Sequence, residues 1–384
     1  MLNRVLVVVL AIGSMLMMQG CWDRVEIEQR GFVVGTALDD AKDHKVALTF
    51  QFAIPSAMKG KGTDAKEGGG KPFINITSEA NSVFKAARIM SNEFSRPPYL
   101  EHNRVIIISE KLARKGHLGE VIDLFTRDPE TRRAAKVMIA EGEARQLLES
   151  NPLIETLPVQ YIDMTAQNPE KSESITPPTN IGQVHAFLLQ NTSFALPKVR
   201  SLDNKVVTSG AAIFDGHTHL LKGFLNEDEA TGRNILTGTL KAGALELIVK
   251  DQVVVFEVKQ MRRTIKASVA DPRRPAFDVH VTVEGNISES HLGQSLIDPD
   301  IMAETEKKAE QKLIDLTTDV TRKVQKVYKT DIFGLSEHLY QEHYQVWRAL
   351  KENWEQGEQI FSKCPIRVHA KVKLHVVGSI LKSE

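Results

Sequence analysis

Residues 298–328 read DPDIMAETEKKAEQKLIDLTTDVTRKVQKVY, the clearest helical pattern in the chain. Asp298 suits the N-cap position and Pro299 suits the first turn, so we expect the helix to begin there. Apolar residues recur at spacings of three and four, the period of a helix with one buried face. These residues are Ala309, Leu313, Leu316, Val320, Val324 and Val327. Since the other face is charged, the helix should cover a sheet.

Two strand patterns flank this helix and supply that sheet. Apolar residues alternate over 277–283, and residues 366–376 read IRVHAKVKLHV. A period of two is typical of a strand, and the basic residues between the apolar ones predict that the last strand has one wet face. We expect helix 298–328 to pack on these strands, and a second helix over 336–354.

The rest of the chain also mixes strands and helices. Residues 59–72 form a Gly- and Lys-rich segment without apolar periodicity and should be a surface loop. The expected elements are a hairpin of strands 31–39 and 45–54, helix 78–94, strand 104–109, helix 110–126 interrupted near Gly116, strand 136–140, helix 142–148, strand-like residues 193–225 with a turn at 215–217, helix 226–236, and strands 245–248 and 253–258. This mixture predicts an α+β protein.

The N-terminus decides the expected compartment. Arg4 precedes Val5–Met18, an apolar run of 14 residues, which is shorter than the ~20 needed to cross a bilayer. We therefore interpret residues 1–20 as a signal peptide. A small residue before a cysteine, Gly20–Cys21, resembles the lipobox of bacterial lipoproteins, although Met18 stands where leucine is preferred. Cleavage would leave Cys21 first, its thiol and amino group acylated, and two acyl chains suffice for stable anchoring. The alternative is an ordinary signal peptide with a chance cysteine.

Composition narrows the function classes. Lys plus Arg and Asp plus Glu both number 49, and no basic stripe is evident, so a nucleic-acid partner is not expected. The apolar fraction of 42% predicts a packed core. If Cys21 is lipidated, Cys364, the second of two cysteines, has no disulfide partner, and we expect it to be a small buried residue.

No catalytic, cofactor or metal constellation is apparent. His217 and His219 flank an expected turn and lack a further ligand at a diagnostic spacing, so we interpret them as exposed hairpin residues. His338 and His343 are five apart, unlike the zinc-protease pattern HExxH. We place the carboxylate pair Asp39–Asp40 in a turn, where aspartate is common for backbone reasons. The sequence favours binding or scaffolding over catalysis.

Several segments carry a family resemblance. They are CWDRVEIE at 21–28, RGFVVGTALD at 30–39, HNR at 102–104, IIISE at 106–110, RDPETR at 127–132, SGAAIF at 209–214 and TDIFGL at 330–335. Together with the lipobox, they resemble the Ger(x)C family, the lipoprotein C subunits of spore germinant receptors. The resemblance spans nearly the whole mature chain, and loop 59–72 reads as a variable insertion.

The resemblance implies a fold and a role. It implies three domains, each a mainly antiparallel or mixed sheet flanked by helices. We place an N-terminal α/β domain at 21–200, a middle β-rich domain at 201–257 and a C-terminal ββααβ domain at 258–384. The implied location is the outer face of the spore inner membrane, anchored by lipid on Cys21. The implied partners are A- and B-type membrane subunits, and whether this subunit binds the nutrient is left open.

Two other classes remain open. A solute-binding lipoprotein of a transporter would need a ligand cleft between two lobes. A lipid-anchored hydrolase of wall or cortex would need a carboxylate pair that faces a cleft. The family offers no catalytic residues to carry over, so Cys21 alone takes a stated role from it. Arg24, Glu26 and Glu28, beside the tether, are candidates for partner contacts.

Overall fold

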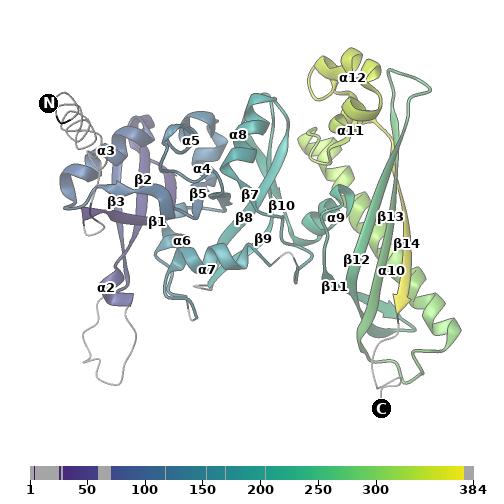
Figure 1. The fold of residues 1–384 in the computed structure, drawn as a ribbon. Helices are drawn as coiled ribbons and strands as arrows, with labels where there is room; N and C mark the ends of the chain where they lie inside the picture. The colour runs from purple at the N-terminus through teal and green to yellow at the C-terminus, as the bar shows by residue number, and fades with distance from the viewer. Residues whose placement is uncertain are drawn as a thin grey trace.

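The computed structural model describes residues 29–375 apart from 59–70, 117, 153, 169 and 204, together with Arg4 and Glu26. Apart from Arg4, the expected signal peptide lies outside the described residues, as do Cys21 and most of loop 59–72. The described strands form one ten-stranded sheet and one four-stranded sheet. Figure 1 shows the two sheets side by side, with helices against each.

The first sheet has parallel strands in its centre and antiparallel strands at both ends. Its order is β10-β9-β8-β6-β5-β1-β2-β3, with β4 beside β1 and β7 beside β6. The strands are β1 (Gly31–Asp40), β2 (Val46–Ala53), β3 (Phe73–Ala80), β4 (Pro98–Tyr99), β5 (Val105–Ser109), β6 (Lys136–Ala140), β7 (Thr179–Asn180), β8 (Phe194–Leu202), β9 (Lys205–Phe214) and β10 (Leu221–Leu225). The neighbours β1, β5, β6 and β8 run parallel. The hairpin expected over 31–54 is confirmed, because β1 and β2 pair antiparallel.

Helices cover both faces of this sheet. The helices are α2 (Pro55–Met58), α3 (Val83–Glu93), α4 (Glu110–Arg114), α5 (Leu118–Arg127), α6 (Ala144–Leu148), α7 (Pro158–Thr165) and α8 (Ile181–Leu189). Ile106 and Ile108 of β5 share a core with residues of α3, α5 and α8. Val105 and Ile107 share another with residues of α6 and α7. In Figure 1, α3, α5 and α8 accordingly lie above the sheet and α6 and α7 below it.

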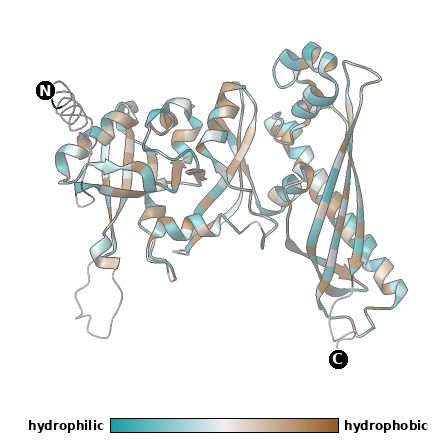
Figure 2. Cartoon of the chain, viewed as in Figure 1, coloured by the Kyte–Doolittle hydropathy of each residue, from teal (hydrophilic) through white to brown (hydrophobic). Residues whose placement is uncertain are grey.

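The second sheet packs against one long helix. Its strands, in order, are β11 (Gly243–Val249), β12 (Gln252–Ser268), β13 (Ala276–Ser290) and β14 (Ile366–His375). Residues Leu313, Leu316 and Val320 of α10 (Pro299–Lys323) share one core with Val279 and Val372 of the sheet, as expected. Hydrophilic and hydrophobic bands alternate along α10 in Figure 2. This side-by-side arrangement of helix and strands confirms the packing that periodicity predicted.

One residue of the apolar stripe expected on helix 298–328 is not buried. Val327 is 65% exposed, because α10 continues as a π-helix, η4 (Val324–Tyr328). A π turn holds more residues than an α turn, so the side chains beyond Val324 rotate out of the stripe. The remaining short turns are η2 (Lys42–His44), η3 (Leu100–His102), η5 (Lys351–Asn353) and η6 (Ile360–Lys363).

Helix α9 (Glu227–Thr237) ties the two sheets together. Asn226 and Glu229 form a capping box at its start. A Cβ on Gly232 would lie 2.3 Å from the carbonyl oxygen of Leu316, so the bare glycine is what allows α9 to contact α10. Ile213 of β9 belongs to the same core as both helices. The end of the first sheet and the second sheet therefore share one hydrophobic core.

Two expected helices differ from the structure. The helix expected over 78–94 begins at Val83, because residues 73–80 pair with β2 as the strand β3. The helix expected over 336–354 breaks at His343, whose φ of −137° and ψ of 52° are not helical, into α11 (Leu335–Glu342) and α12 (Tyr344–Leu350). The α+β class is confirmed.

The expected domain limits fall within strands. Residue 200 lies in β8 and residue 257 in β12, and β8 and β9 pair in one sheet. The three-domain division stays a prediction. Among the described helices, none has the length and apolar content needed to cross a membrane.

Candidate functional site

The predicted lipidation site and the tether lie outside the described residues. Gly20, Cys21, Arg24 and Glu28 have no described structure, whereas Glu26 is exposed. The candidate sites within the folded body are therefore its polar clusters.

The carboxylate of Asp215 organises the turn that carries His217 and His219. The backbone N–H groups of His217 and Thr218 each donate to Asp215 Oδ1 over 2.9 Å. His219 adopts a positive φ of 57° at the end of the turn. Over the part of the chain that the structure describes, no three His, Cys, Asp or Glu side chains gather as metal ligands would.

Cys364 lies in the core, as expected. It is 4% exposed and shares the hydrophobic core of the second sheet. Burial raises the pKa of its thiol to about 12. Since the thiolate is the reactive form of cysteine, this buried thiol is poorly suited to nucleophilic chemistry.

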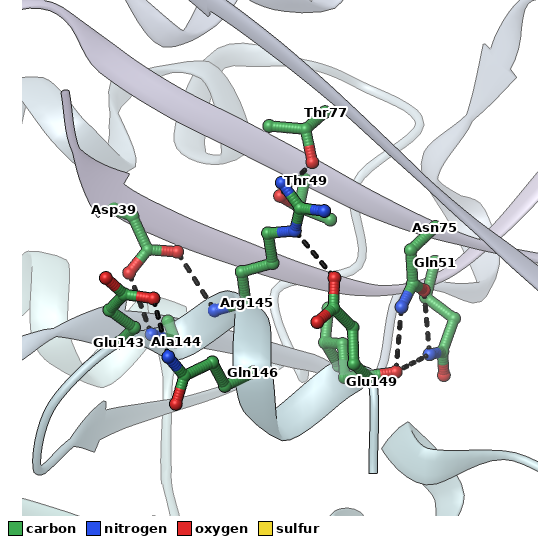
Figure 3. Close-up of polar contacts among 11 residues, drawn as sticks. Asp39, Thr49, Gln51, Asn75, Thr77, Glu143, Ala144, Arg145, Gln146 and Glu149 are labelled. Carbon is green, nitrogen blue, oxygen red and sulfur yellow. Dashed lines mark hydrogen bonds and ion pairs between the residues drawn. The ribbon is translucent and has the colours of Figure 1, made fainter.

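Asp39 and Asp40 were expected in a turn, and this was wrong. Both end strand β1, because β1 continues its pairing with β2 through them. Asp39 accepts the N–H groups of Ala144 and Arg145 at the start of α6, over 2.7 and 2.9 Å (Figure 3). Burial raises the pKa of Asp39, while these two hydrogen bonds oppose the rise. The carboxylate therefore fastens α6 to the central sheet.

A second polar contact fixes the other end of α6. Gln51 of β2 and Asn75 of β3 both donate to the carbonyl oxygen of Leu148, over 2.9 and 2.8 Å. Gln51 also accepts the N–H of Val159, the second residue of α7. Figure 3 shows both amide side chains converging on the end of α6. Sequence reasoning missed this cluster, since Gln51 looked like the polar member of an alternating strand.

The most buried acidic cluster joins the two halves of the molecule. Ser193, which precedes β8, donates to Glu355 Oε2 over 2.6 Å and accepts the N–H of Gly216. Glu355 also accepts the N–H of Asp331. Burial, followed by the nearby charge of Asp331, raises the pKa of Glu355 to about 7. We call Ser193, Gly216, Asp331 and Glu355 the acidic junction.

Asp331, in the segment TDIFGL at 330–335, accepts several hydrogen bonds that fix the loop before α11. Its carboxylate accepts the N–H groups of Phe333, Leu335 and Ser336, the last over 2.7 Å. It also accepts the indole N–H of Trp354 over 3.0 Å. These donors hold the loop before α11 against Trp354, which follows η5. The acidic junction is therefore saturated with internal hydrogen bonds.

Further contacts reinforce the link between the halves. Lys323 of α10 pairs with Glu229 of α9 at 2.7 Å. The hydroxyl of Tyr328 donates to the carbonyl oxygen of Phe224 in β10 over 2.9 Å. Both contacts connect segments about a hundred residues apart in sequence, as the separations of 94 and 104 show.

Comparison with known families covers both halves of the molecule. Residues 23–201 match the family described as spore germination protein N-terminal domain, and residues 209–378 match spore germination B3/GerAC like, C-terminal. The chain belongs to the Ger(x)C family of spore germination proteins. The resemblance seen in the sequence motifs is thus confirmed.

Relatives of this Ger(x)C chain are similar along their full lengths. Spore germination protein B3 of Bacillus subtilis (strain 168) is 28% identical over 94% of this chain and 95% of its own. Spore germination protein KC of the same organism is 25% identical over 98% of this chain and 97% of its own. The crystal structure of the GerBC protein matches with a TM-score of 0.62 and 25% identity, over 91% of this chain and 99% of that one. The described fold is therefore the fold of this family.

Proposed function

We propose that this protein is the lipid-anchored C subunit of a nutrient germinant receptor, and that it acts by assembling with A- and B-type membrane subunits. The observation that supports it best is the family match over 23–201 and 209–378. That match begins two residues after Cys21, the residue expected to carry the lipid. Relatives with whole-length similarity are spore germination proteins.

The anchoring part of the proposal rests on residues 1–21. Cleavage between Gly20 and Cys21, followed by acylation of Cys21, would leave a folded body on a lipid tether at the outer face of the spore inner membrane. Confinement there raises the effective concentration of the body toward membrane subunits without any added contact. The tether leads into β1 by way of Gln29 and Arg30.

The geometry favours assembly over hydrolysis. A glycoside hydrolase of wall or cortex uses two carboxylates that reach the substrate, whereas Asp331 and Glu355 are 2% and 8% exposed. Their oxygens accept hydrogen bonds from the protein itself. The same bonds suit a joint that holds two halves in one orientation, which a subunit that contacts several partners requires.

Co-purification from spore membranes tests the assembly. The full chain should travel with A- and B-type subunits, and its deletion should abolish the response to one class of nutrient while receptor-independent germination continues. Cys21→Ala should leave an unprocessed, unlipidated precursor and reduce that response, whereas Cys364→Ala should leave processing unchanged. A chain that never accompanies those subunits, in spores whose every nutrient response survives deletion, would contradict the proposal.

A further inference from the structure

A cavity of about 620 Å³ lies where the two sheets meet. Phe187 of α8 and Phe194 of β8 line it from the first sheet. Residues of α9, β12 and α11 line it from the second. This volume is within the ~300–1,000 Å³ typical of small-molecule sites, and such sites often occur between domains.

Arg233 of α9 is the unusual group in this cavity. Its Nη1 donates to Asn234 Oδ1 over 3.3 Å, and its Nε is buried without a hydrogen-bond partner. Burial lowers its pKa to about 10, and no acidic side chain of the described residues contributes to that shift. Arg233 is half-buried, and its guanidinium, with a buried Nε, lacks a carboxylate partner among the described residues. A partly desolvated cation of this kind is unfavourable, so an anion that reaches it would be bound strongly.

Arg263 of β12 adds a second positive charge. Its Nη1 donates to the carbonyl oxygen of Leu236 at the end of α9. Gly238, with a φ of +75°, ends that helix, and a Cβ there would lie 3.3 Å from Arg263 Nε. Burial lowers the pKa of Arg263, again with no acidic contribution from the described residues. One bond to the helix end leaves the rest of the guanidinium fork for a ligand.

The other residues that line the cavity indicate what else, besides a negative charge, its ligand should carry. The rings of Phe187 and Phe194 stack at 5.2 Å, and Phe333, which precedes α11, also lines the cavity. Glu337 is exposed on α11 and is bonded by Gln341. Its negative charge at the cavity disfavours a ligand with several negative charges.

We propose that this cavity binds a small organic monocarboxylate with an apolar or aromatic portion. The carboxylate contacts Arg233, Arg263 adds positive charge to the same cavity, and the apolar portion packs on the phenylalanine rings. A planar guanidinium suits bidentate binding of a carboxylate. The occupant would touch elements of both sheets, so binding should stabilise the joint between them. This role goes beyond the proposed assembly with membrane subunits and does not depend on it.

Binding of phenylacetate to the full chain, purified in a mild non-ionic detergent, tests the proposal. Ligand-observed NMR and a rise in melting temperature should both report phenylacetate binding, while neutral 2-phenylethanol and inorganic phosphate should bind much more weakly. Arg233→Gln should weaken phenylacetate binding at least about tenfold, as expected when a hydrogen bond to a charged group is lost. Arg322→Gln is the matched control, because Arg322 is an exposed arginine of α10 that pairs with Asp319.

A second variant keeps the test decisive if Arg233→Gln does not fold. Gln341→Glu adds a negative charge on exposed α11 and should also weaken phenylacetate binding, with circular dichroism confirming the fold. The proposal is overturned if phenylacetate fails to bind the unaltered chain at millimolar concentration. It is also overturned if 2-phenylethanol binds equally well, or if folded Arg233→Gln or Gln341→Glu binds as tightly as Arg322→Gln.

Discussion

Strands β5 and β14 both pair with parallel neighbours, yet their sequences differ in kind. β5 reads VIIIS, and every residue in it is buried. β14 reads IRVHAKVKLH, and its basic side chains are exposed. Helices lie on both faces of β5, whereas the core lies on one face of β14. A continuous apolar run thus marks a strand covered on both sides, and alternation marks a strand with one wet face.

The position of each strand in its sheet adds a second difference. β5 is central, but β14 ends the order of its sheet. In β14, the edge N–H groups of Val372 and Leu374 donate to Glu310 and Glu306 of α10. Lysines along an edge strand also discourage pairing with another chain. Lys371 and Lys373 occupy this position in β14. The charges of Lys371 and Lys373 on the wet face of β14 therefore disfavour edge pairing, while a charge anywhere in β5 would disrupt the core.

Charge substitution in β5 should have the largest effect. The side chains of Ile106 and Ile107 lie on opposite faces of the first sheet. Ile106→Lys and Ile107→Lys should each prevent folding, because an unpaired buried ion carries a penalty of several kcal/mol. Soluble yield and thermal melting measure this. Lys371→Thr, on the wet face of β14, is the control and should melt as the unaltered chain does. If either β5 variant folds normally, that face of the first sheet is not covered.

Truncation of the α10 stripe should have the next largest effect. Leu316→Ala should destabilise the chain by ~2–5 kcal/mol, the usual range for a buried leucine. Val327→Ala should have little effect, because Val327 is 65% exposed beyond the π turn. Urea unfolding measures the loss in free energy of unfolding for each of the two variants. Equal losses would place Val327 in the core, as periodicity alone predicts.

The acidic junction should make stability depend on pH. The pKa of Glu355 is raised from 4.5 to about 7, so the folded state holds this proton more tightly than the unfolded state. The stabilisation is complete below pH 4.5 and is lost as the pH rises through about 7. The loss should be on the order of 3 kcal/mol at most, given ~1.4 kcal/mol for each pKa unit.

Glu355→Gln should flatten that pH profile and make the chain more stable than the unaltered one near pH 8. Glu352→Gln is the control, because the Glu352 side chain is 82% exposed three residues away. Melting temperatures between pH 4 and pH 8 measure both. A Glu355→Gln profile as steep as the control's would assign the pH dependence to other groups.

Period and capping residues predicted most of the elements, because they act over one or two turns. Asp298 caps α10 as expected, and the helix expected from residue 226 is α9, capped by Asn226. Strand β3 was not predicted because its sequence, FINITSEA, mixes polar and apolar residues. It forms a strand because it pairs with β2. The break at His343 was likewise not visible, since the apolar spacing continues through it.

The polar clusters could not be predicted from the sequence for a different reason. Ser193 and Glu355 are 162 residues apart, and Asp39 lies 105 residues from Ala144. No local pattern connects such residues, and their contact exists only once the sheets have formed. The proposed anchor at Cys21 is the opposite case, because the lipobox pattern that predicts it consists of adjacent residues alone.

The smallest effect should come from the polar attachment of α6. Asp39→Asn keeps the shape of the side chain but replaces one acceptor oxygen with an amide donor, so one of the N–H groups of Ala144 and Arg145 loses its partner. Loss of a helix-capping interaction typically destabilises by about 1 kcal/mol. Asp123→Asn is the control, because it breaks only an exposed pair with Arg127, worth ~0.3–0.5 kcal/mol. Hydrogen exchange should show faster opening of α6 in Asp39→Asn while α10, held by apolar contacts, stays protected. Uniform loss of protection across both helices would mean that the two sheets unfold as one unit and that the polar and apolar modes of attachment are not separable.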